Sequence, residues 1–353
     1  MYNLFVKKEQ TLYEVLKRET RPIVVYGMGN GADKIFDICE NKGIKITDIF
    51  ASDEFVRGHS FRDIRVKTYG EICELYGDFV ILLAFAVFKD DLMDKIENMA
   101  SEHTLLVPDV PLFGGGLFDY DFLTVNMDNI KKAYNLFADD KSREVFVDII
   151  NFRLTGDPKI LRRCETDRAE VFSSIIKLGD NEAYVDLGAY DGDTIKEFLD
   201  NTNNKYSVIT AFEPDKKNMK KLHRAFGDLE NCRLLPYASW ECDCEMNFSG
   251  SGGRMSCFDE SGYKVLARSV DSVCDRADYI KMDVEGAEYE TLMGCREIIK
   301  RFRPSLAVSA YHRVGDIFTL PILIDSLNHG YKIYLRHHKY LPSWESNLYV
   351  IYN

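Results

Sequence analysis

Acidic side chains gather at three places in the sequence where an apolar run ends and a helical pattern begins. The first is the stretch Tyr184–Thr194, in which Asp186, Asp191 and Asp193 surround a glycine turn. Glycines at such a turn let the backbone approach a ligand, and the start of the next helix offers free N–H groups. Carboxylates in this number would repel a dianionic pyrophosphate but suit a ligand that carries positive charge. The turn therefore favours a cationic ligand over a dinucleotide.

Two further acidic stretches follow in the order that a nucleoside-binding α/β sheet requires. Glu213 ends the apolar run that starts at Ile209, at the place where an acid binds ribose hydroxyls in Rossmann-like sites. Asp283 and Glu285 follow the apolar run from Tyr279, so we expect them at the carboxyl edge of the same sheet. Each stretch alone could be an ordinary helix start, because acids cap helices and are favoured in the first turn. Their order along the chain favours a binding site.

The three stretches together resemble the FkbM family of S-adenosylmethionine-dependent methyltransferases, over roughly Asp180–Asn353. The resemblance depends on Tyr184–Thr194, Phe212–Pro214 and Ile280–Glu288, of which the last is the most specific. It implies a class I methyltransferase fold and transfer of a methyl group to a hydroxyl of a small molecule or glycan. The cofactor site predicted within these stretches consists of Asp186, Gly188, Ala189, Tyr190, Asp191, Gly192, Asp193, Thr194, Glu213, Pro214 and Asp283.

The resemblance also assigns roles to some of these residues. It implies that Asp186, Gly188 and Gly192 hold the methionine part of S-adenosylmethionine. Glu213 would hold the ribose, and Asp283 would line the place where the methyl group is transferred.

His312 follows the next apolar run, so we expect it on the same edge of the sheet as Asp283. A neutral imidazole there can take the proton of an acceptor hydroxyl. We therefore predict His312 as the general base, with Asp283 and Glu285 beside it in the catalytic site. A surface histidine with a local hydrogen bond is the alternative. The same side chains could hold a divalent ion, as acids do in catechol-type O-methyltransferases, but the sequence does not favour a metal.

An earlier glycine turn predicts a second site near the N-terminus. Gly27 and Gly29 fit the pattern Gly-x-Gly-x-x-Ala after an apolar run, and Asp53 stands where a ribose-binding acid would follow the second strand. A nucleotide-sugar- or NAD-binding oxidoreductase that uses these residues is therefore the alternative function. A structural or oligomerising domain that keeps the glycines for backbone geometry is the other interpretation.

Short apolar runs alternate with helical patterns along most of the chain, which predicts an α/β fold with mainly parallel sheets. The predicted strands are 22–26, 44–50, 79–84 and 104–107, then 183–187, 208–212, 232–235, 279–282, 306–309, 332–335 and 348–351. The last two have no long helix between them, which predicts an antiparallel pair. We therefore expect two Rossmann-like domains, residues 1–110 and a seven-stranded methyltransferase domain 181–353, joined by a helical connector over 111–180.

Two other stretches allow more than one interpretation. Ser249–Gly253 is rich in glycine and predicts either a hairpin turn or a lid over the acceptor. Tyr334–His338 carries an arginine and two histidines, which predicts a solvated strand end or, alternatively, contact with an anionic or glycan acceptor. A third interpretation is that the chain is a non-catalytic binding module with vestigial sites. The presence of Asp186, Glu213 and Asp283 argues against it.

The composition excludes several classes of protein. The formal net charge is -12 and no basic run appears, which argues against a nucleic-acid substrate. No apolar run reaches the roughly 18 residues of a membrane span, and the N-terminus lacks the apolar core of a signal peptide. We therefore expect no membrane insertion and a cytoplasmic protein. Nine cysteines without a Cys-x-x-Cys pair favour reduced thiols over structural zinc. The expected partner is a small-molecule or glycan acceptor, and homo-oligomers are a further expectation.

Overall fold

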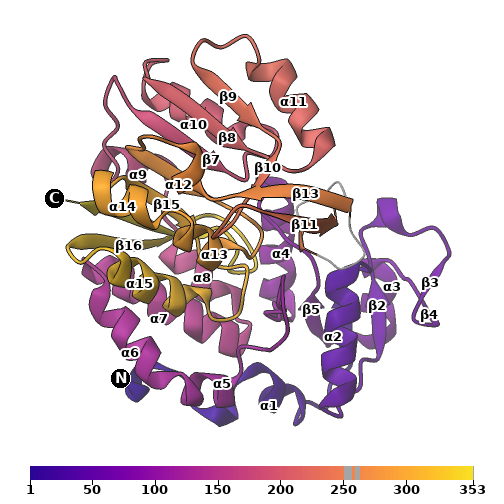
Figure 1. The fold of residues 1–353 in the computed structure, drawn as a ribbon. Helices are drawn as coiled ribbons and strands as arrows, with labels where there is room; N and C mark the ends of the chain where they lie inside the picture. Colours follow the sequence, from indigo (N-terminus) through magenta and orange to yellow (C-terminus); the bar gives the residue numbers. More distant parts are fainter. Residues whose placement is uncertain (250–256, 259–262, 353) are drawn as a thin grey trace.

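The computed structural model describes residues 1–249, 257–258 and 263–352, which form two α/β units and a group of helices that lies between them in the chain (Figure 1). The first unit has a four-stranded sheet in the order β2-β1-β5-β6, with every neighbouring pair parallel. Its strands are β1 (Ile23–Tyr26), β2 (Asp48–Phe50), β5 (Val80–Leu83) and β6 (Thr104–Leu106), with a small hairpin of β3 (Ser60–Phe61) and β4 (Ile64–Arg65). Its helices are η1 (Tyr2–Leu4), η2 (Lys8–Gln10), α1 (Leu12–Leu16), α2 (Asn30–Asn41), η3 (Asp53–Phe55), α3 (Tyr69–Tyr76) and α4 (Asp90–Glu102).

The connector consists of helices that pack into the protein core. They are α5 (Tyr120–Val125), α6 (Met127–Leu136), α7 (Asp140–Thr155), α8 (Pro158–Cys164) and α9 (Arg168–Ser174). One continuous cluster of buried side chains includes Phe79 of the first unit, Phe146 of α7 and Ile333 of the last unit. The connector therefore fixes the two sheets relative to each other through apolar burial.

The last unit has a seven-stranded sheet in the order β16-β17-β15-β14-β7-β8-β9, in which only β17 runs antiparallel to its neighbours. Its strands are β7 (Ala183–Leu187), β8 (Val208–Phe212), β9 (Cys232–Leu235), β14 (Tyr279–Met282), β15 (Ser305–Ser309), β16 (Tyr331–His337) and β17 (Ser346–Tyr352). Its helices are α10 (Asp193–Asn201), α11 (Lys216–Phe226), α12 (Val270–Val273), α13 (Glu288–Met293), α14 (Arg296–Phe302) and α15 (Asp316–Leu327). The predicted fold class is confirmed.

The chain order of this sheet reverses between β7 and β14, since β8 and β9 lie on one side and β15 on the other. Open α/β sheets bind ligands at such a switch point, beyond the carboxyl ends of the strands. The acidic stretches after β7, β8 and β14 all come to this edge, as the sequence predicted.

A third sheet that the sequence analysis did not predict stands between β9 and β14 along the chain. It contains β10 (Tyr237–Ser239), β11 (Cys244–Ser249), β12 (Cys257–Phe258) and β13 (Tyr263–Arg268), in the order β10-β13-β11-β12. Burial alternates along β13, so one face of this sheet is exposed and its sequence lacks a continuous apolar run. Of the glycine-rich stretch Ser249–Gly253, residues 250–253 lie outside the described residues.

Among the residues that the model describes, no helix combines the length and the apolar character needed to cross a membrane.

The charged end of β16 is buried, so neither interpretation of Tyr334–His338 describes it. Arg336, His337 and His338 are all below one tenth exposed. Arg336 Nη2 donates to Asp139 Oδ2 at 2.6 Å, and Arg336 Nη1 donates to Ser142 Oγ at 2.8 Å. Because Asp139 also caps α7 by accepting from the Ser142 backbone N–H, this arginine ties the connector to the last sheet.

Replacing this arginine should loosen the attachment of the connector. We expect Arg336→Met to lower the free energy of unfolding by about 2 kcal/mol, because it removes charge-assisted hydrogen bonds from a buried site. Lys141→Met is the matched control, since the ion pair of Lys141 on α7 with Glu170 on α9 is exposed, and it should cost less than about 0.5 kcal/mol. Chemical denaturation measures both, and equal losses would contradict the role given to Arg336.

Candidate active site

The turn after β7 passes directly under the end of β14. Gly188 has φ +79°, and a Cβ atom there would lie 1.9 Å from the carbonyl oxygen of Asp283. Gly192 has φ +91°, and its Cβ would lie 2.1 Å from the ring of Phe226. Only glycine fits either place, because both the conformation and the space exclude a side chain. Tyr190 between them also has a positive φ of 48°, so the turn is held in a strained form of the kind found at binding sites.

Asp186 lies below this turn and stabilises it. Its Oδ2 accepts a hydrogen bond from Thr194 Oγ1 at 2.6 Å, and its Oδ1 lies 3.3 Å from Lys281 Nζ. Lys281 Nζ also donates to the carbonyl oxygen of Gly188 at 2.8 Å. Burial alone would lower the pKa of Lys281, but Asp186 and Asp283 outweigh it and raise that pKa above its ordinary value.

Lys281 is a site residue that the sequence analysis missed. The sequence feature that could have pointed to Lys281 is a lysine inside an apolar run. This run forms β14, in which every residue is buried. A charged side chain in such a strand needs a partner, and the acids of the same edge supply it.

Glu213 joins the turn after β7 to the turn after β8. Its Oε2 accepts from the backbone N–H of Tyr190 and its Oε1 from that of Asp215, both at 2.8 Å. Burial raises the pKa of Glu213 to about 7, against the effect of these two hydrogen bonds. The carboxylate is therefore fixed in place while each oxygen keeps a lone pair for a ligand.

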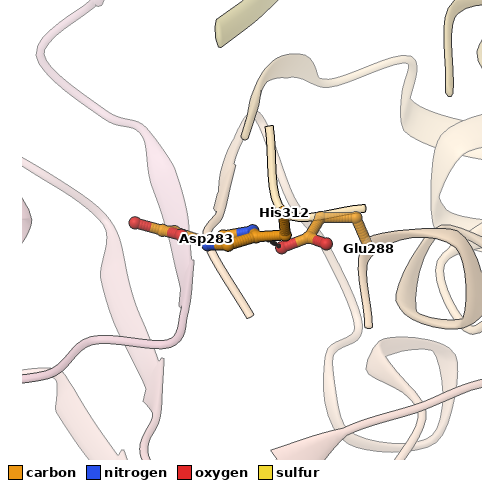
Figure 2. Close-up of side chains that lie close together, drawn as sticks. All are labelled: Asp283, Glu288 and His312. Atoms are coloured by element: carbon orange, nitrogen blue, oxygen red, sulfur yellow. Dashed lines mark hydrogen bonds and ion pairs between the residues drawn. The ribbon is translucent and has the colours of Figure 1, made fainter. Parts of the chain in front are cut away.

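Three acids from the stretch after β14 surround His312, which follows β15. Glu288 Oε1 lies 2.9 Å from His312 Nδ1, while Asp283 Oδ1 and Glu285 Oε2 lie 3.4 Å and 3.5 Å from Nε2. Figure 2 shows the imidazole between the carboxylates of Asp283 and Glu288. Glu288 is buried and also accepts from the backbone N–H of Val284 at 2.9 Å, so it orients the ring.

This cluster separates the pKa values of its members. Burial alone would lower the pKa of His312, but Glu288, Asp283 and Glu285 together raise it to about 10. Burial would raise the pKa of Asp283, yet Lys281 and His312 hold it below its ordinary value. Burial raises the pKa of Glu285 to about 8.

The imidazole of His312 is thus positively charged at neutral pH in this surrounding. The sequence analysis predicted a neutral His312 as the general base. The acids around the ring favour its charged form instead. Glu285 carries the pKa nearest to neutral pH among the acids that face Nε2, as suits a group that accepts a proton during turnover. Glu288, which the sequence analysis left without a role, fixes the ring from the other side.

A cavity of about 480 Å³ lies over this edge of the sheet. The predicted cofactor residues that line it are Gly188, Tyr190, Asp193, Thr194, Glu213, Pro214 and Asp283. The predicted cofactor residues that do not line it are Asp186, Ala189, Asp191 and Gly192. Asp186 supports the turn from below and Gly192 gives room to Phe226, so the sequence pattern marks residues that build the turn as well as residues that face a ligand. Both Glu285 and His312 line the same cavity.

Ligand atoms of Asp283, Glu288 and His312 lie within 4.8 Å of one another, which is close enough for a shared metal ion. The imidazole, however, stands between the two carboxylates with one nitrogen toward each (Figure 2). A single ion cannot take both ring nitrogens, so these three side chains suit a row linked by one hydrogen bond and one ion pair better than a chelate.

The N-terminal glycine turn has a packing explanation. Gly27 has φ +114°, and a Cβ atom there would lie 2.7 Å from the ring of Phe85. A Cβ atom at Gly29 would have no neighbour within 4 Å. Asp53 is exposed at the start of η3. The turn glycine therefore makes room for an aromatic side chain of its own domain, and the oxidoreductase alternative is not supported.

The strand order, the glycine turn at the switch point and the acids at the carboxyl edge define a Rossmann-like methyltransferase fold. Residues 186–340 match the family model of the methyltransferase FkbM domain. This match confirms, over these residues, the resemblance to the FkbM family found in the sequence.

The whole chain is similar to the crystal structure of a methyltransferase FkbM from Methylobacillus flagellatus KT. The TM-score is 0.75 at 22% sequence identity, and the match covers 98% of this chain and 95% of that one. At this identity the likeness shows a common fold, which includes the N-terminal sheet and the connector. No curated protein matches the sequence.

Two weaker matches are structures with a bound cofactor or product. A fibrillarin from Aeropyrum pernix with natively bound S-adenosyl-L-methionine matches at TM-score 0.34 and 12% identity, over 52% of this chain and 73% of that one. A putative methyltransferase from Streptococcus mutans in complex with SAH matches at TM-score 0.32 and 12% identity, over 49% and 90%. These TM-scores are too low to support an argument about this chain.

The two glycine turns should respond differently to the same substitution. We expect Gly188→Ala to lower the free energy of unfolding by about 2 to 4 kcal/mol, because the methyl group would strike the backbone of Asp283 in a left-handed conformation. Gly29→Ala should change it by less than about 0.5 kcal/mol, since nothing lies within 4 Å of the added atom. Thermal and chemical unfolding test the pair, and a tolerated Gly188→Ala would show that the turn is not closed against β14.

Proposed function

We propose that the protein is an S-adenosylmethionine-dependent O-methyltransferase that acts on a hydroxyl of a small molecule or glycan. The observation that carries the proposal is the cluster of Asp283, Glu285 and His312 on the wall of the cavity, which the glycine turn also lines. It combines a place for a cationic ligand with a group that can remove a proton from an acceptor.

The residues present fit S-adenosylmethionine. The cavity volume of about 480 Å³ lies in the usual range for sites of small molecules and cofactors. Asp193 and Asp283 on its wall suit the ammonium and sulfonium charges, and Glu213 has free lone pairs for ribose hydroxyls. The close approach of Gly188 to Asp283 leaves space above the turn for a ligand.

The acids around His312 support oxygen as the methyl acceptor. S-adenosylmethionine supplies the methyl group: the carbon–oxygen bond forms as the carbon–sulfur bond breaks, and the electron pair of the broken bond stays on sulfur. The hydroxyl proton must pass to the protein, and we assign this step to the carboxylate of Glu285. The charged His312 keeps Asp283 ionised and offsets the negative charge of the acids around it.

Calorimetry with S-adenosylhomocysteine tests the cofactor without knowledge of the acceptor. We expect binding by the full chain, and a Glu213→Gln protein should bind at least tenfold more weakly, about 1.4 kcal/mol, because one backbone donor or ribose hydroxyl loses its acceptor. Glu230→Gln is the matched control, an exposed acid that should leave affinity within twofold. Binding of NAD or a UDP-sugar in place of S-adenosylhomocysteine would contradict the proposal.

The rate of methyl transfer should rise with pH. Glu285 accepts a proton only when ionised, and its pKa is about 8. A pKa of this value ionises roughly one tenth of the carboxyls at pH 7 and nine tenths at pH 9, so kcat should rise roughly ninefold between them. Glu285→Gln should lose at least a hundredfold in kcat and show no such rise.

Two controls accompany the pH profile. Glu297→Gln, an exposed acid on α14, should keep both the rate and the rise. Treatment with EDTA should leave the profile unchanged, because a carboxylate and not a metal-bound water accepts the proton. A flat profile from pH 7 to 9 would remove Glu285 from this role, and loss of turnover in EDTA would favour a divalent ion at Asp283, Glu285 and His312.

A further inference from the structure

Helix α11 carries a run of basic side chains that the sequence analysis overlooked. Six of the nine residues from 216 to 224 are basic and exposed, and we name them the basic face: Lys216, Lys217, Lys220, Lys221, His223 and Arg224. The buried residues of the same helix are Asn218, Met219 and Leu222. The statement that no basic run appears in the sequence is therefore wrong for this helix.

The protein does not neutralise the basic face. Among the residues that the structure describes, no acid forms an ion pair with any of its six members. The hydrogen bond of Lys221 Nζ goes to a neutral group, Asn218 Oδ1, at 3.2 Å. Exposed lysines elsewhere do pair with acids, as Lys196 does with Asp200 one turn further along α10. The charge of the basic face is therefore available to a partner outside the chain.

This arrangement works against the helix that carries it. Lys216 and Lys217 stand in the first turn, which contains no acid, although the positive end of the helix dipole disfavours cations there. Lys216 and Lys220 are four residues apart, as are Lys220 and Arg224, so like charges repel each other along the exposed surface. The helix forms because its apolar side chains are buried. Charges that a protein keeps against local stability indicate a function, here the binding of an anionic partner.

The basic face contrasts with the charge of the whole protein. The helix contains five of the 45 Lys and Arg residues and none of the 57 Asp and Glu residues, so the other 40 cations stand against 57 acids, a formal charge of -17. At physiological ionic strength, charges on a surface act over about 8 Å. A partner that touches only α11 is therefore attracted, whereas a long polyanion also meets the acidic remainder.

The position of α11 suits a flat partner. Figure 1 shows the helix at the outer edge of the methyltransferase unit, near β9, which is the last strand of the seven-stranded sheet. Side chains on a helix surface point away from its axis, so the basic face spreads over a convex surface and does not surround one small anion. None of its six members lines the cavity. A flat anionic surface can contact several of them at once.

We propose that the basic face docks the protein on the headgroup layer of an anionic lipid bilayer. Clusters of Lys and Arg on one helix are typical of proteins that bind anionic lipids. Four of the five permanently charged side chains are lysines, whose compact charges suit a diffuse layer of headgroups, whereas arginine predominates in nucleic-acid recognition.

Docking through α11 would bring an edge of the cavity close to the bilayer. Lys221 Nζ lies 4.9 Å from the ring centroid of Tyr190, and Tyr190 lines the cavity. The inference goes beyond the proposed function and does not depend on it, because the basic face lies outside the cavity.

Vesicle sedimentation with the full chain tests the docking. The probes are vesicles of phosphatidylcholine alone and vesicles of phosphatidylcholine mixed with phosphatidylglycerol. We expect the protein to bind only the mixed vesicles and to be released at about 1 M salt, where the Debye length falls to about 3 Å. Inorganic phosphate at constant ionic strength should not release the protein, and release by phosphate would show that the basic face binds a single small anion instead.

A triple variant tests whether the basic face is responsible. Lys217→Gln, Lys220→Gln and Arg224→Gln together should weaken binding to the mixed vesicles at least tenfold, since each cation near an anionic membrane contributes roughly fivefold in affinity. Thermal unfolding shows whether the variant is folded, and its Tm should equal or exceed that of the parent because like charges no longer repel along the helix. Lost binding together with a lower Tm would assign these side chains a structural role instead.

The matched control removes the same charge from other helices. It combines Lys132→Gln on α6, Lys159→Gln on α8 and Arg301→Gln on α14, all of which are exposed. This variant should bind the mixed vesicles within twofold of the parent.

Three further results would overturn the inference. The first is absence of binding to the mixed vesicles, or equal binding to phosphatidylcholine alone. The second is an equal loss of binding in the control variant, which would make net charge and not the basic face responsible. The third is tighter binding of an RNA or DNA oligonucleotide that the triple variant abolishes, which would make nucleic acid the partner. Calorimetry with S-adenosylhomocysteine tests the proposed function separately, so either proposal can fail while the other stands.

Discussion

The site depends on the contacts of one buried ammonium group, that of Lys281. It stands at the switch point, close to the carboxylate of Asp186 and hydrogen-bonded to the carbonyl oxygen of Gly188. Charge from Asp283 acts on it as well. An uncompensated charge there would be very costly, so the two turns that bring these acids together must close around it. The same contact allows Gly188 to lie under Asp283, which shapes the floor of the cavity.

The sequence predicted most of the sheet that carries the site because its central strands β7, β8 and β14 are buried on both faces. These strands are mostly apolar, and the predicted bounds of β7, β8, β9 and β14 agree with the structure. The sheet of β10, β11, β12 and β13 has an exposed face and short strands, so its sequence resembles a loop. Lys281 and Glu288 were missed for another reason: spacing places a residue at an edge of a sheet, but side-chain pairing needs the third dimension.

The two glycine turns show how far a motif can be interpreted. Gly27 and Gly188 both follow a buried strand and both have positive φ. The first faces the ring of Phe85 in its own domain, whereas the second faces the backbone of a neighbouring strand and borders the cavity. A glycine pattern therefore indicates that the backbone of a turn has no room for a side chain. Whether a side chain or a ligand causes the crowding depends on residues far away in the sequence.

Residues from both α/β units line the wall of the cavity. Phe88 and Tyr340 are far apart in the chain, and they stack only because the connector holds the two units in one position. The continuous buried core and the Arg336–Asp139 pair provide that rigidity. Two units that moved freely could not keep this contact, and the part of the cavity wall that both rings line would lose its shape. The connector and Lys281 thus act in the same way, since each holds in place a part of the cavity whose residues lie far apart in the sequence.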